Sequence, residues 1–216
     1  MFGEIYFFNE IKTKNPELSL SLSDALQNPD EYNLAEFLSI ESCKIVENTI
    51  KICRKMGLSE VSSQALFYSA LTDSKEVQIL IYRLGIDLQK IQTDFKNYLE
   101  KSRSQGNRGS AIESGGPKQK KSDLLFSGSF QKTINGAAKT ADERGNKLIG
   151  EKEILFNLAR YDELFKKSLI EEDLKEEDIE NITLWLDFLE KKINENRKFW
   201  TKDNLKKTGS LGRDFA

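Results

Sequence analysis

The chain of 216 residues contains no histidine, two cysteines and three prolines. Without histidine it cannot form a histidine-based triad, use a histidine general base or build the common histidine-containing zinc sites. Cys43 and Cys53 alone cannot supply four zinc ligands. On one helix they would lie about 15 Å apart along the axis, too far for a disulfide. We therefore expect two reduced structural thiols and no metal site.

Long hydrophobic runs are also missing. No stretch approaches the ~20 consecutive apolar residues that a membrane-spanning helix needs. The start of the chain has neither the basic beginning nor the long apolar core of a signal peptide. The net charge is −2, which gives no global electrostatic reason to bind nucleic acid. These absences predict a cytoplasmic protein with no membrane partner and no nucleic-acid partner.

What the chain does contain favours an all-α fold. Charged residues make up 31% and hydrophobic residues 38% of the sequence. Residues 42–71 read as a helix that stops at Gly57 in the left-handed conformation, followed by a second helix capped by Ser62 or Ser63. A third helix is expected to end at Gly85, and a fourth to begin at Asp87. Together these segments predict a four-helix unit.

The same outline recurs about 88 residues further along the chain. Gly57 falls on Gly145, so both helices have the same stop signal. The apolar positions keep step as well: Val46 falls on Ile134, Ile50 on Ala138, Cys53 on Ala141, Val61 on Ile149, Leu66 on Ile154, Phe67 on Leu155 and Tyr68 on Phe156. The sequence therefore predicts two pseudo-symmetric four-helix repeats.

These repeats are expected at residues 38–102 and 123–196. Residues 103–122 are rich in Gly, Ser, Lys and Arg and predict a flexible linker. Its basic charges would allow contact with an acidic partner or nucleic acid, but a solvated spacer is favoured. Residues 1–37 form an acidic arm, and residues 197–216 a polar connector.

The arm is expected to pack only in part. It contains two short predicted helices, near Ser23–Gln27 and Leu34–Leu38. Its first apolar cluster would add a strand or cover a groove; it consists of Ile5, Tyr6, Phe7 and Phe8.

The last helix is longer than its counterpart in the first repeat. Along it runs a seam with heptad-like spacing that is apolar except at Asn196. The seam comprises Ile179, Ile182, Leu186, Leu189, Ile193, Asn196 and Trp200. Two interpretations remain open. The seam either packs on the helices of its own repeat or forms a signalling or oligomerisation helix.

Catalytic motifs are absent. The phosphate-binding pattern GxxxxGK[ST] does not occur. Acidic groups such as 171–173 and 176–178 are better explained as solvated residues that favour a helix start. We therefore expect that this chain is not an enzyme and that it binds no cofactor.

The repeats resemble the double N-terminal repeat (Clp-N) of Clp-type AAA+ chaperone ATPases. The resemblance lies in Val61–Leu71, in Leu84-Gly85-Ile86-Asp87 and in the second copy, Ile149–Ala159. The sequence Gly212-Arg213-Asp214-Phe215 is similar to the stretch that leads such chains into their first ATPase module. The resemblance covers residues 38–216 and implies a chain truncated before that module.

It further implies an N-terminal domain that docks substrates or adaptors for an ATP-dependent protein-unfolding chaperone, which regulates a protease. The implied partners are unfolded or tagged proteins, an adaptor and a Clp peptidase reached through the parent hexamer. ATP and Mg²⁺ are expected only for that parent. The implied peptide-binding or adaptor-binding residues are Gln64, Phe67, Lys152 and Phe156.

One family role does not carry over. Some members bind phosphoarginine through a glutamate at the positions of Gln64 and Lys152, but a neutral amide or a cation cannot replace that carboxylate. The alternative to a docking domain is a free-standing helical scaffold protein that dimerises through the helix at residues 179–200.

Overall fold

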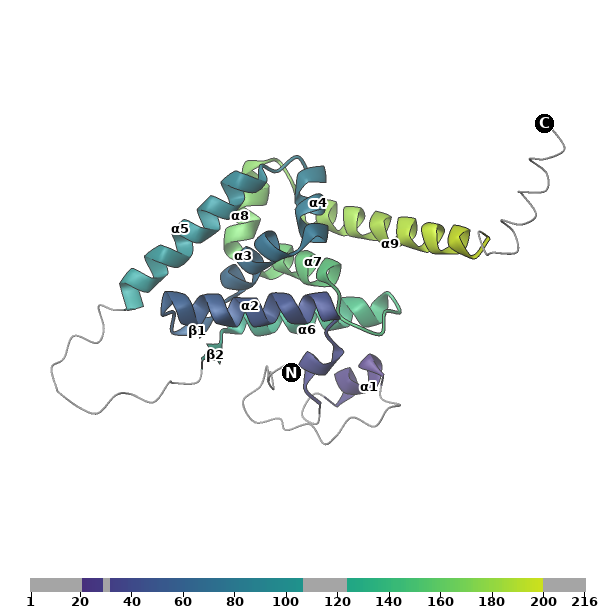
Figure 1. The fold of residues 1–216 in the computed structure, drawn as a ribbon, viewed down its shortest axis with the longest axis horizontal. Helices are drawn as coiled ribbons and strands as arrows, with labels where there is room; N and C mark the ends of the chain where they lie inside the picture. The colour runs from purple at the N-terminus through teal and green to yellow at the C-terminus, as the bar shows by residue number, and fades with distance from the viewer. Residues whose placement is uncertain (1–20, 29–31, 107–123, 200–216) are drawn as a thin grey trace, which may run out of the picture. The chain divides into compact units, whose positions relative to one another are not determined.

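The computed structural model describes residues 21–28, 32–106 and 124–199 (Figure 1). The described residues are mostly helical, which confirms the predicted all-α class. They divide into two compact units, Met1–Ile179 and Glu180–Ala216. The duplicated helices lie in the first unit, and the second contains most of the last helix.

The elements follow the order that the periodicity predicts. The first repeat contains α2 (Ile40–Met56), β1 (Glu60–Val61), α3 (Ser63–Asp73), α4 (Lys75–Arg83) and α5 (Leu88–Gly106). The second contains β2 (Leu125–Phe126), α6 (Gly128–Glu143), α7 (Glu151–Tyr161), α8 (Glu163–Glu171) and α9 (Glu176–Phe199). Before them lie α1 (Leu22–Gln27) and the 3-10 helix η1 (Leu34–Phe37).

The predicted helix boundaries have the expected local causes. Gly57 closes α2 in the left-handed conformation, with φ 67°. The Ser62 hydroxyl caps α3 by accepting from the backbone N–H of Ala65. The Asp87 carboxylate accepts from the N–H groups of the first turn of α5, at 2.8 Å from Gln89. These caps satisfy amide groups that a helix start leaves without an intrahelical partner.

The duplication is visible in the backbone. Gly145 repeats the left-handed turn of Gly57, with φ 72°. The second left-handed position of the first repeat is Gly85, at φ 79°, and the same offset leads to Asp173, at φ 56°. Aspartate tolerates this region better than most side chains. The turn therefore persists although its glycine is lost.

Two short parallel pairings tie the repeats together. Val61, in the loop after α2, pairs with Phe126, just before α6. By the same offset, Ile149 pairs with Leu38. Matching backbone hydrogen bonds of 2.9 Å extend both pairings, from Ser127 N–H to Val61 C=O and from Ser39 N–H to Ile149 C=O. Each repeat thus pairs its backbone with the start of the other, through a strand in one case and a single bridge in the other.

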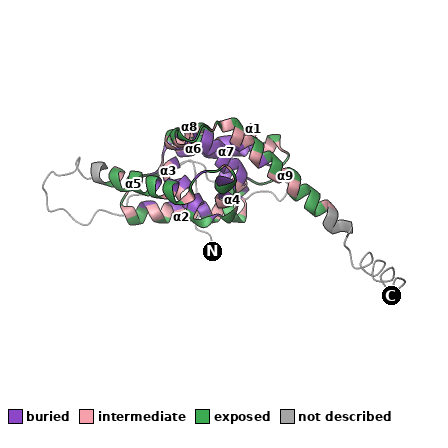
Figure 2. Ribbon diagram, turned by 90° about the horizontal axis from the view of Figure 1, so that it is seen from above, coloured by how far each residue is buried: buried purple, intermediate pink, exposed green. Residues whose placement is uncertain are grey.

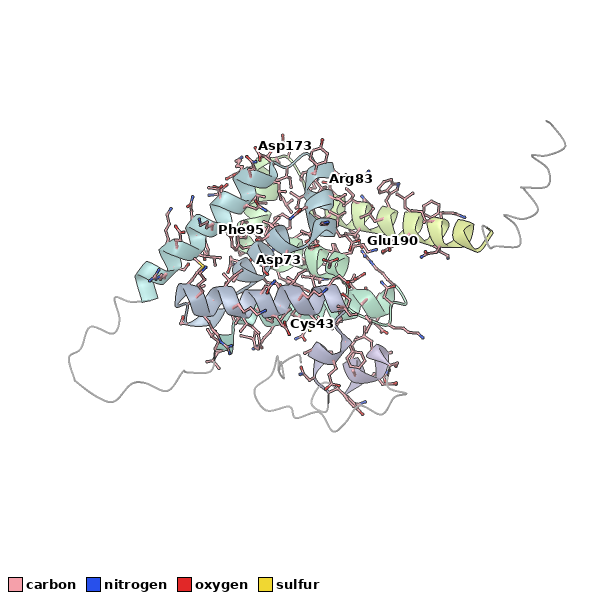
Figure 3. The ribbon with its side chains drawn as sticks, viewed as in Figure 1. Cys43, Asp73, Arg83, Phe95, Asp173 and Glu190 are labelled. Carbon is pink, nitrogen blue, oxygen red and sulfur yellow. The ribbon has the colours of Figure 1, made fainter. Side chains whose placement is uncertain are left out.

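The two repeats also share one core (Figure 2). The Phe67 ring of α3 meets Phe95 of α5 edge to face, with centroids 4.8 Å apart, and Phe165 of α8 at 4.1 Å. Figure 3 labels Phe95 among the side chains of α5. All three rings are fully buried. Aromatic contacts across the repeats therefore stabilise them as one body.

The described part of the arm packs on the second repeat. α1 and η1 both contact α6, and they bury Leu22, Ala25, Leu34 and Phe37. The two short helices lie where the sequence predicts them. The apolar cluster Ile5–Phe8 lies outside the described residues, as do residues 107–122 of the predicted linker.

The first compact unit ends where the core stripe of the last helix loses its apolar character. In α5 the core-facing residues are Ile91, Phe95 and Leu99, all buried. The same offset places Ile179, Thr183 and Asp187 at these positions of α9. Only Ile179 is apolar, and the first unit ends at that residue. The apolar stripe of α5 is thus not repeated along α9, although Thr183 is buried.

Candidate docking groove on the first repeat

A groove of about 600 Å³ opens on the first repeat between α2, α3 and α5. Its volume lies within the range of sites that bind small ligands or peptide side chains. The lining residues are Ile52, Lys55, Met56, Tyr68, Lys96, Glu100 and Arg103. We call it the α2–α5 groove.

The floor of the α2–α5 groove is apolar. Ile52 and Met56 lie four residues apart on α2 and therefore on one face of that helix. Both are half-buried, whereas their neighbour Cys53 is fully buried in the core. Tyr68 of α3 is also half-buried. Partial burial leaves apolar surface that a bound side chain would cover.

The rim of the groove is predominantly cationic. Lys55, Lys96 and Arg103 are exposed, and the one lining carboxylate belongs to Glu100. Lys96 Nζ lies 4.0 Å from Glu100 Oε1 across one helical turn. Lys55 and Arg103 lie near the C-terminal ends of α2 and α5, where cations also stabilise the helix dipole. The rim therefore favours ligands that carry carboxylates.

The second repeat has no equivalent open surface at the matching position. The counterparts of Met56 and Tyr68 are Arg144 and Phe156. Phe156 is 3% exposed. The guanidinium groups of Arg160 and Arg144 lie 5.0 and 5.8 Å from the centroid of its ring, and Arg144 is 3.5 Å from the Glu153 carboxylate. These cation–π contacts and this ion pair cover Phe156.

Three of the four residues predicted to bind a peptide have intramolecular partners. Phe67 lies at the centre of the core, and Phe156 is covered as described. Lys152 is 8% exposed, and its Nζ lies 3.7 Å from Glu76 Oε1, which joins α7 to α4. A peptide would have to displace these contacts to reach the three side chains.

Gln64 is the exception. It is half-buried and lies on α3 one turn before Tyr68, on the same face of that helix. It is thus the predicted residue that shares a helix face with a lining residue of the α2–α5 groove. The binding role of all four residues stays a prediction.

The sequence contained a partial signal for the groove. The apolar positions of α2 cover more of its circumference than one core stripe needs, but Ile52 and Met56 read as core because they share its periodicity. The alignment of Tyr68 with Phe156 in the duplication also identified the position in the second repeat that corresponds to the groove. The rim could not be predicted, because it requires α2 and α5 to be placed side by side.

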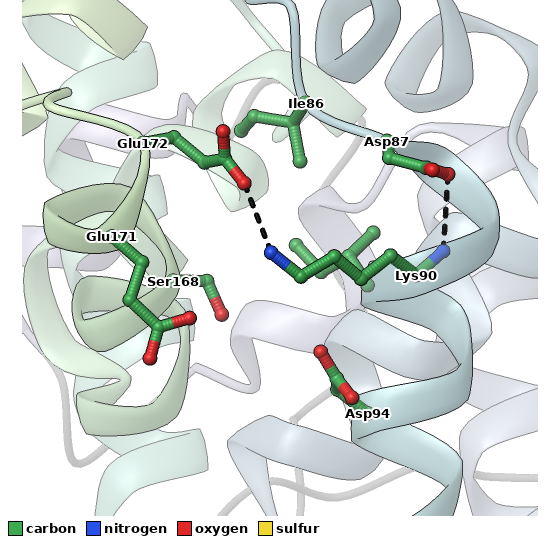
Figure 4. Close-up of a pocket in the computed structure, with 8 residues that line it drawn as sticks. Ile86, Asp87, Lys90, Asp94, Ser168, Glu171 and Glu172 are labelled. Carbon is green, nitrogen blue, oxygen red and sulfur yellow. Dashed lines mark hydrogen bonds and ion pairs between the residues drawn. The ribbon is translucent and has the colours of Figure 1, made fainter.

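A second, smaller depression lies between α5 and α8 (Figure 4). Lys90 Nζ donates to Glu172 Oε1 at 3.1 Å across it, and this hydrogen bond, together with the negative charge, raises the pKa of Lys90. The cavity measures about 10 Å³, which is room for one water at most. It is an exposed contact between the repeats and has no space for a ligand.

Two further findings concern the described residues. Their cysteine and acidic side chains do not gather into any group able to hold a metal ion. No helix in this part of the chain has the length and apolar character needed to cross a membrane.

The cysteines fit the expected structural role. Both thiols are free, and Cys53 is fully buried while Cys43 is half-buried. Burial raises the pKa of the Cys53 thiol to about 11. At neutral pH this thiol is protonated and poorly reactive.

Comparisons with known proteins identify the fold. No protein-family model and no curated protein sequence matches the chain. Among solved structures, the Hsp104 N-terminal domain from Candida albicans is similar with a TM-score of 0.55 and 13% identity, over 69% of this chain and 91% of that one.

Two further matches are N-domains of ClpV. The N-terminal domain of ClpV1 ATPase from E. coli (EAEC Sci1 T6SS) has a TM-score of 0.54 and 16% identity, over 71% of this chain and 88% of that one. A complex of the ClpV N-domain with a VipB peptide has a TM-score of 0.50 and 14% identity, over 68% and 84%. The chain thus has the fold of Clp ATPase N-terminal domains, as the repeats predicted.

Proposed function

We propose that this chain is a docking domain that receives protein segments for a Clp-type protein-unfolding ATPase and that the α2–α5 groove binds them. The fold is shared with N-terminal domains of such ATPases, and a ClpV N-domain of this fold forms a complex with a peptide from VipB. The single observation that carries the proposal is the groove, with its half-buried apolar floor and its cationic rim.

The chemistry of the groove defines its ligand as an acidic, amphipathic segment. Apolar side chains of the segment cover Ile52, Met56 and Tyr68, and its carboxylates face the rim. The source is an adaptor or an unfolded protein substrate. ATP and Mg²⁺ act in a motor module outside this chain, and a peptidase is reached only through that motor.

The floor supplies most of the affinity. Burying two large apolar side chains contributes about 3–6 kcal/mol, against which stands the cost of immobilising the segment. Each exposed ion pair adds only about 0–1 kcal/mol. Charges at such a surface chiefly govern selectivity and association rate. We therefore expect weak binding, with a Kd on the order of 10–100 μM.

A fluorescence-anisotropy titration tests the site. The probe is a short fluorescein-labelled peptide in which Leu and Phe alternate with Glu. Met56→Asp places a charge on the floor and is expected to weaken binding about tenfold or more. Ile170→Asp is the matched control, because Ile170 is an apolar residue of α8 that is 72% exposed and does not line the groove. Equal affinity of the two variants would contradict the assignment.

A charge-reversed probe tests the rim. When every Glu of the peptide is replaced by Lys, the cationic rim repels it, so the affinity should fall. Added salt should weaken binding of the acidic probe and strengthen binding of the basic one. If both peptides bind equally at low salt, the groove is not selective for carboxylates.

An assay of ATP hydrolysis tests whether this chain only docks protein segments and performs no catalysis of its own. The purified chain is expected to release no phosphate from ATP, with or without Mg²⁺. Turnover that co-purifies with the chain would contradict a pure docking role.

A further inference from the structure

The part of α9 in the second compact unit carries an exposed apolar face. Three large apolar side chains near the seam are solvent-exposed, Trp185 at 42%, Phe188 at 56% and Ile193 at 52%, while Leu184, at 45%, lies on the opposite side of the helix. Ile182, Leu186 and Leu189 are half-buried. Single exposed apolar residues are common on soluble proteins, but a contiguous group marks an interaction surface.

Comparison with the first repeat shows that these apolar residues of α9 do not occupy core positions of the repeated unit. By the offset that relates the repeats, Leu184, Trp185 and Phe188 correspond to Lys96, Asn97 and Glu100 of α5. Those three residues are exposed and polar. These apolar side chains of α9 therefore occupy positions that face solvent in the first repeat.

The spacing of the seam suggests which partner fits. Ile182, Leu186, Leu189 and Ile193 follow one another at intervals of four, three and four residues. The pattern is the same when it is read from either end. An antiparallel second copy of the helix would therefore place isoleucine opposite isoleucine and leucine opposite leucine, in the alternating spacing of a coiled coil.

Charge along α9 selects the same arrangement. Residues 176–187 include five acidic residues and no basic one. Residues 188–199 include four basic and two acidic residues. Antiparallel pairing brings the acidic half of each helix against the basic half of the other, whereas parallel pairing opposes like charges.

We propose that α9 pairs with the α9 helix of a second copy of this chain in antiparallel orientation. The seam Ile182–Ile193 forms the centre, and Trp185 flanks it. The helix has 24 residues and is thus roughly 36 Å long, which gives few layers of contact. Association is therefore weak and concentration-dependent. This pairing is independent of the α2–α5 groove.

Sedimentation velocity across a range of protein concentrations tests the pairing. The full chain is expected to shift from monomer to dimer as its concentration rises. Leu186→Asp buries a carboxylate in the seam and should weaken the dimer about tenfold or more. Ile170→Asp, in the first unit, is the control and should dimerise like the unchanged chain. A chain that stays monomeric at all concentrations, or a Leu186→Asp variant that dimerises normally, overturns the proposal.

A second variant distinguishes loss of the pairing from unfolding of α9 itself. Lys192→Glu leaves every apolar residue in place but removes a basic charge beside the seam, where Lys192 also contacts Glu195 and the Phe188 ring. This variant should also weaken the dimer, and circular dichroism should show unchanged helix content. Dimerisation of this variant at the original strength would overturn the antiparallel charge pairing.

The orientation is measured with a spin label at Glu180→Cys in a Cys43→Ser background, since Cys53 is buried and poorly reactive. In the antiparallel pair this position lies level with residue 195 of the second copy. The labels are then separated by roughly 22 Å along the axis, in addition to the lateral distance across the two helices. In a parallel pair the labels have no axial separation, so only that lateral distance divides them. The shorter distance would overturn the antiparallel arrangement.

Discussion

Asp162 is the buried carboxyl that joins the two repeats. It begins α8 by accepting from Phe165 N–H at 2.8 Å and also accepts from the Ser63 hydroxyl of α3 at 2.6 Å. Its side chain has no exposed surface, and desolvation raises its pKa above the usual value, although both hydrogen bonds oppose that rise. One residue therefore serves as a helix cap and as a link between repeats.

Replacing Asp162 by Ala removes both hydrogen bonds and leaves the Ser63 hydroxyl buried without its acceptor. We expect the free energy of unfolding to fall by about 1–3 kcal/mol. Asp162→Asn keeps a capping oxygen and is the control, with a smaller loss at neutral pH. Urea denaturation monitored by circular dichroism measures both. Equal losses for the two variants would show that capping is not the main contribution.

The raised pKa of Asp162 also predicts the sign of a pH effect. The folded chain holds this proton more tightly than the unfolded chain, so the stabilisation from protonation is complete below the unfolded pKa near 3.8. It is lost as pH rises through the higher folded pKa. The unchanged chain should therefore gain stability relative to Asp162→Asn as pH is lowered from 7 toward 4. The opposite trend in urea midpoints would contradict the raised pKa.

At the scale of the helices, α6 and α7 pack closely at Gly136. Gly136 of α6 faces Asn157 and Tyr161 of α7, and a Cβ at this position would collide with the Asn157 Oδ1 atom and lie 2.7 Å from Tyr161 Cε2. Asn157 is fixed by its own hydrogen bonds to Thr140 Oγ1 and Glu153 C=O. The absence of a side chain at Gly136 therefore allows this pair of helices to pack.

Gly136→Ala is expected to lower the free energy of unfolding by about 1–3 kcal/mol, because the core must shift to admit a methyl group. The control is Gly128→Ala, at the exposed start of the same helix, where no atom lies within 4 Å of the added Cβ. That change should be neutral or stabilise by up to about 1 kcal/mol. Thermal unfolding of both variants compares them, and similar melting temperatures would contradict the packing argument.

The elements were largely predictable from the sequence, because their signals are local. Apolar periodicity, Gly57 as a stop and Asp87 as a cap lie within a few residues of the structure that they determine. The left-handed turn at Asp173 was not evident, because it is defined by its counterpart Gly85 rather than by its own residue type. The exchange of short strands between repeats was also missed, because it depends on contacts far apart in the sequence.

At the scale of the whole first unit, the duplication produces a symmetric scaffold with asymmetric surfaces. The core positions agree in both repeats, but the α2–α5 groove is open in the first, whereas Arg144 and Arg160 cover Phe156 in the second. The predicted site residues followed the symmetry and therefore fell mostly on buried positions. Sequence comparison between repeats locates shared core more readily than a surface found in only one of them.

The central claim is that a single groove on the first repeat receives acidic, amphipathic segments. Methyl NMR spectra of the chain, recorded during titration with the unlabelled Leu/Phe/Glu peptide, test it most directly. The account predicts that the largest shift changes occur at the Ile52 and Met56 methyl groups, while Ile134 and Ile154 in the second repeat stay unchanged. Changes centred on Ile154, beside Phe156, or on Ile193 of α9, with Ile52 and Met56 unaffected, would contradict it.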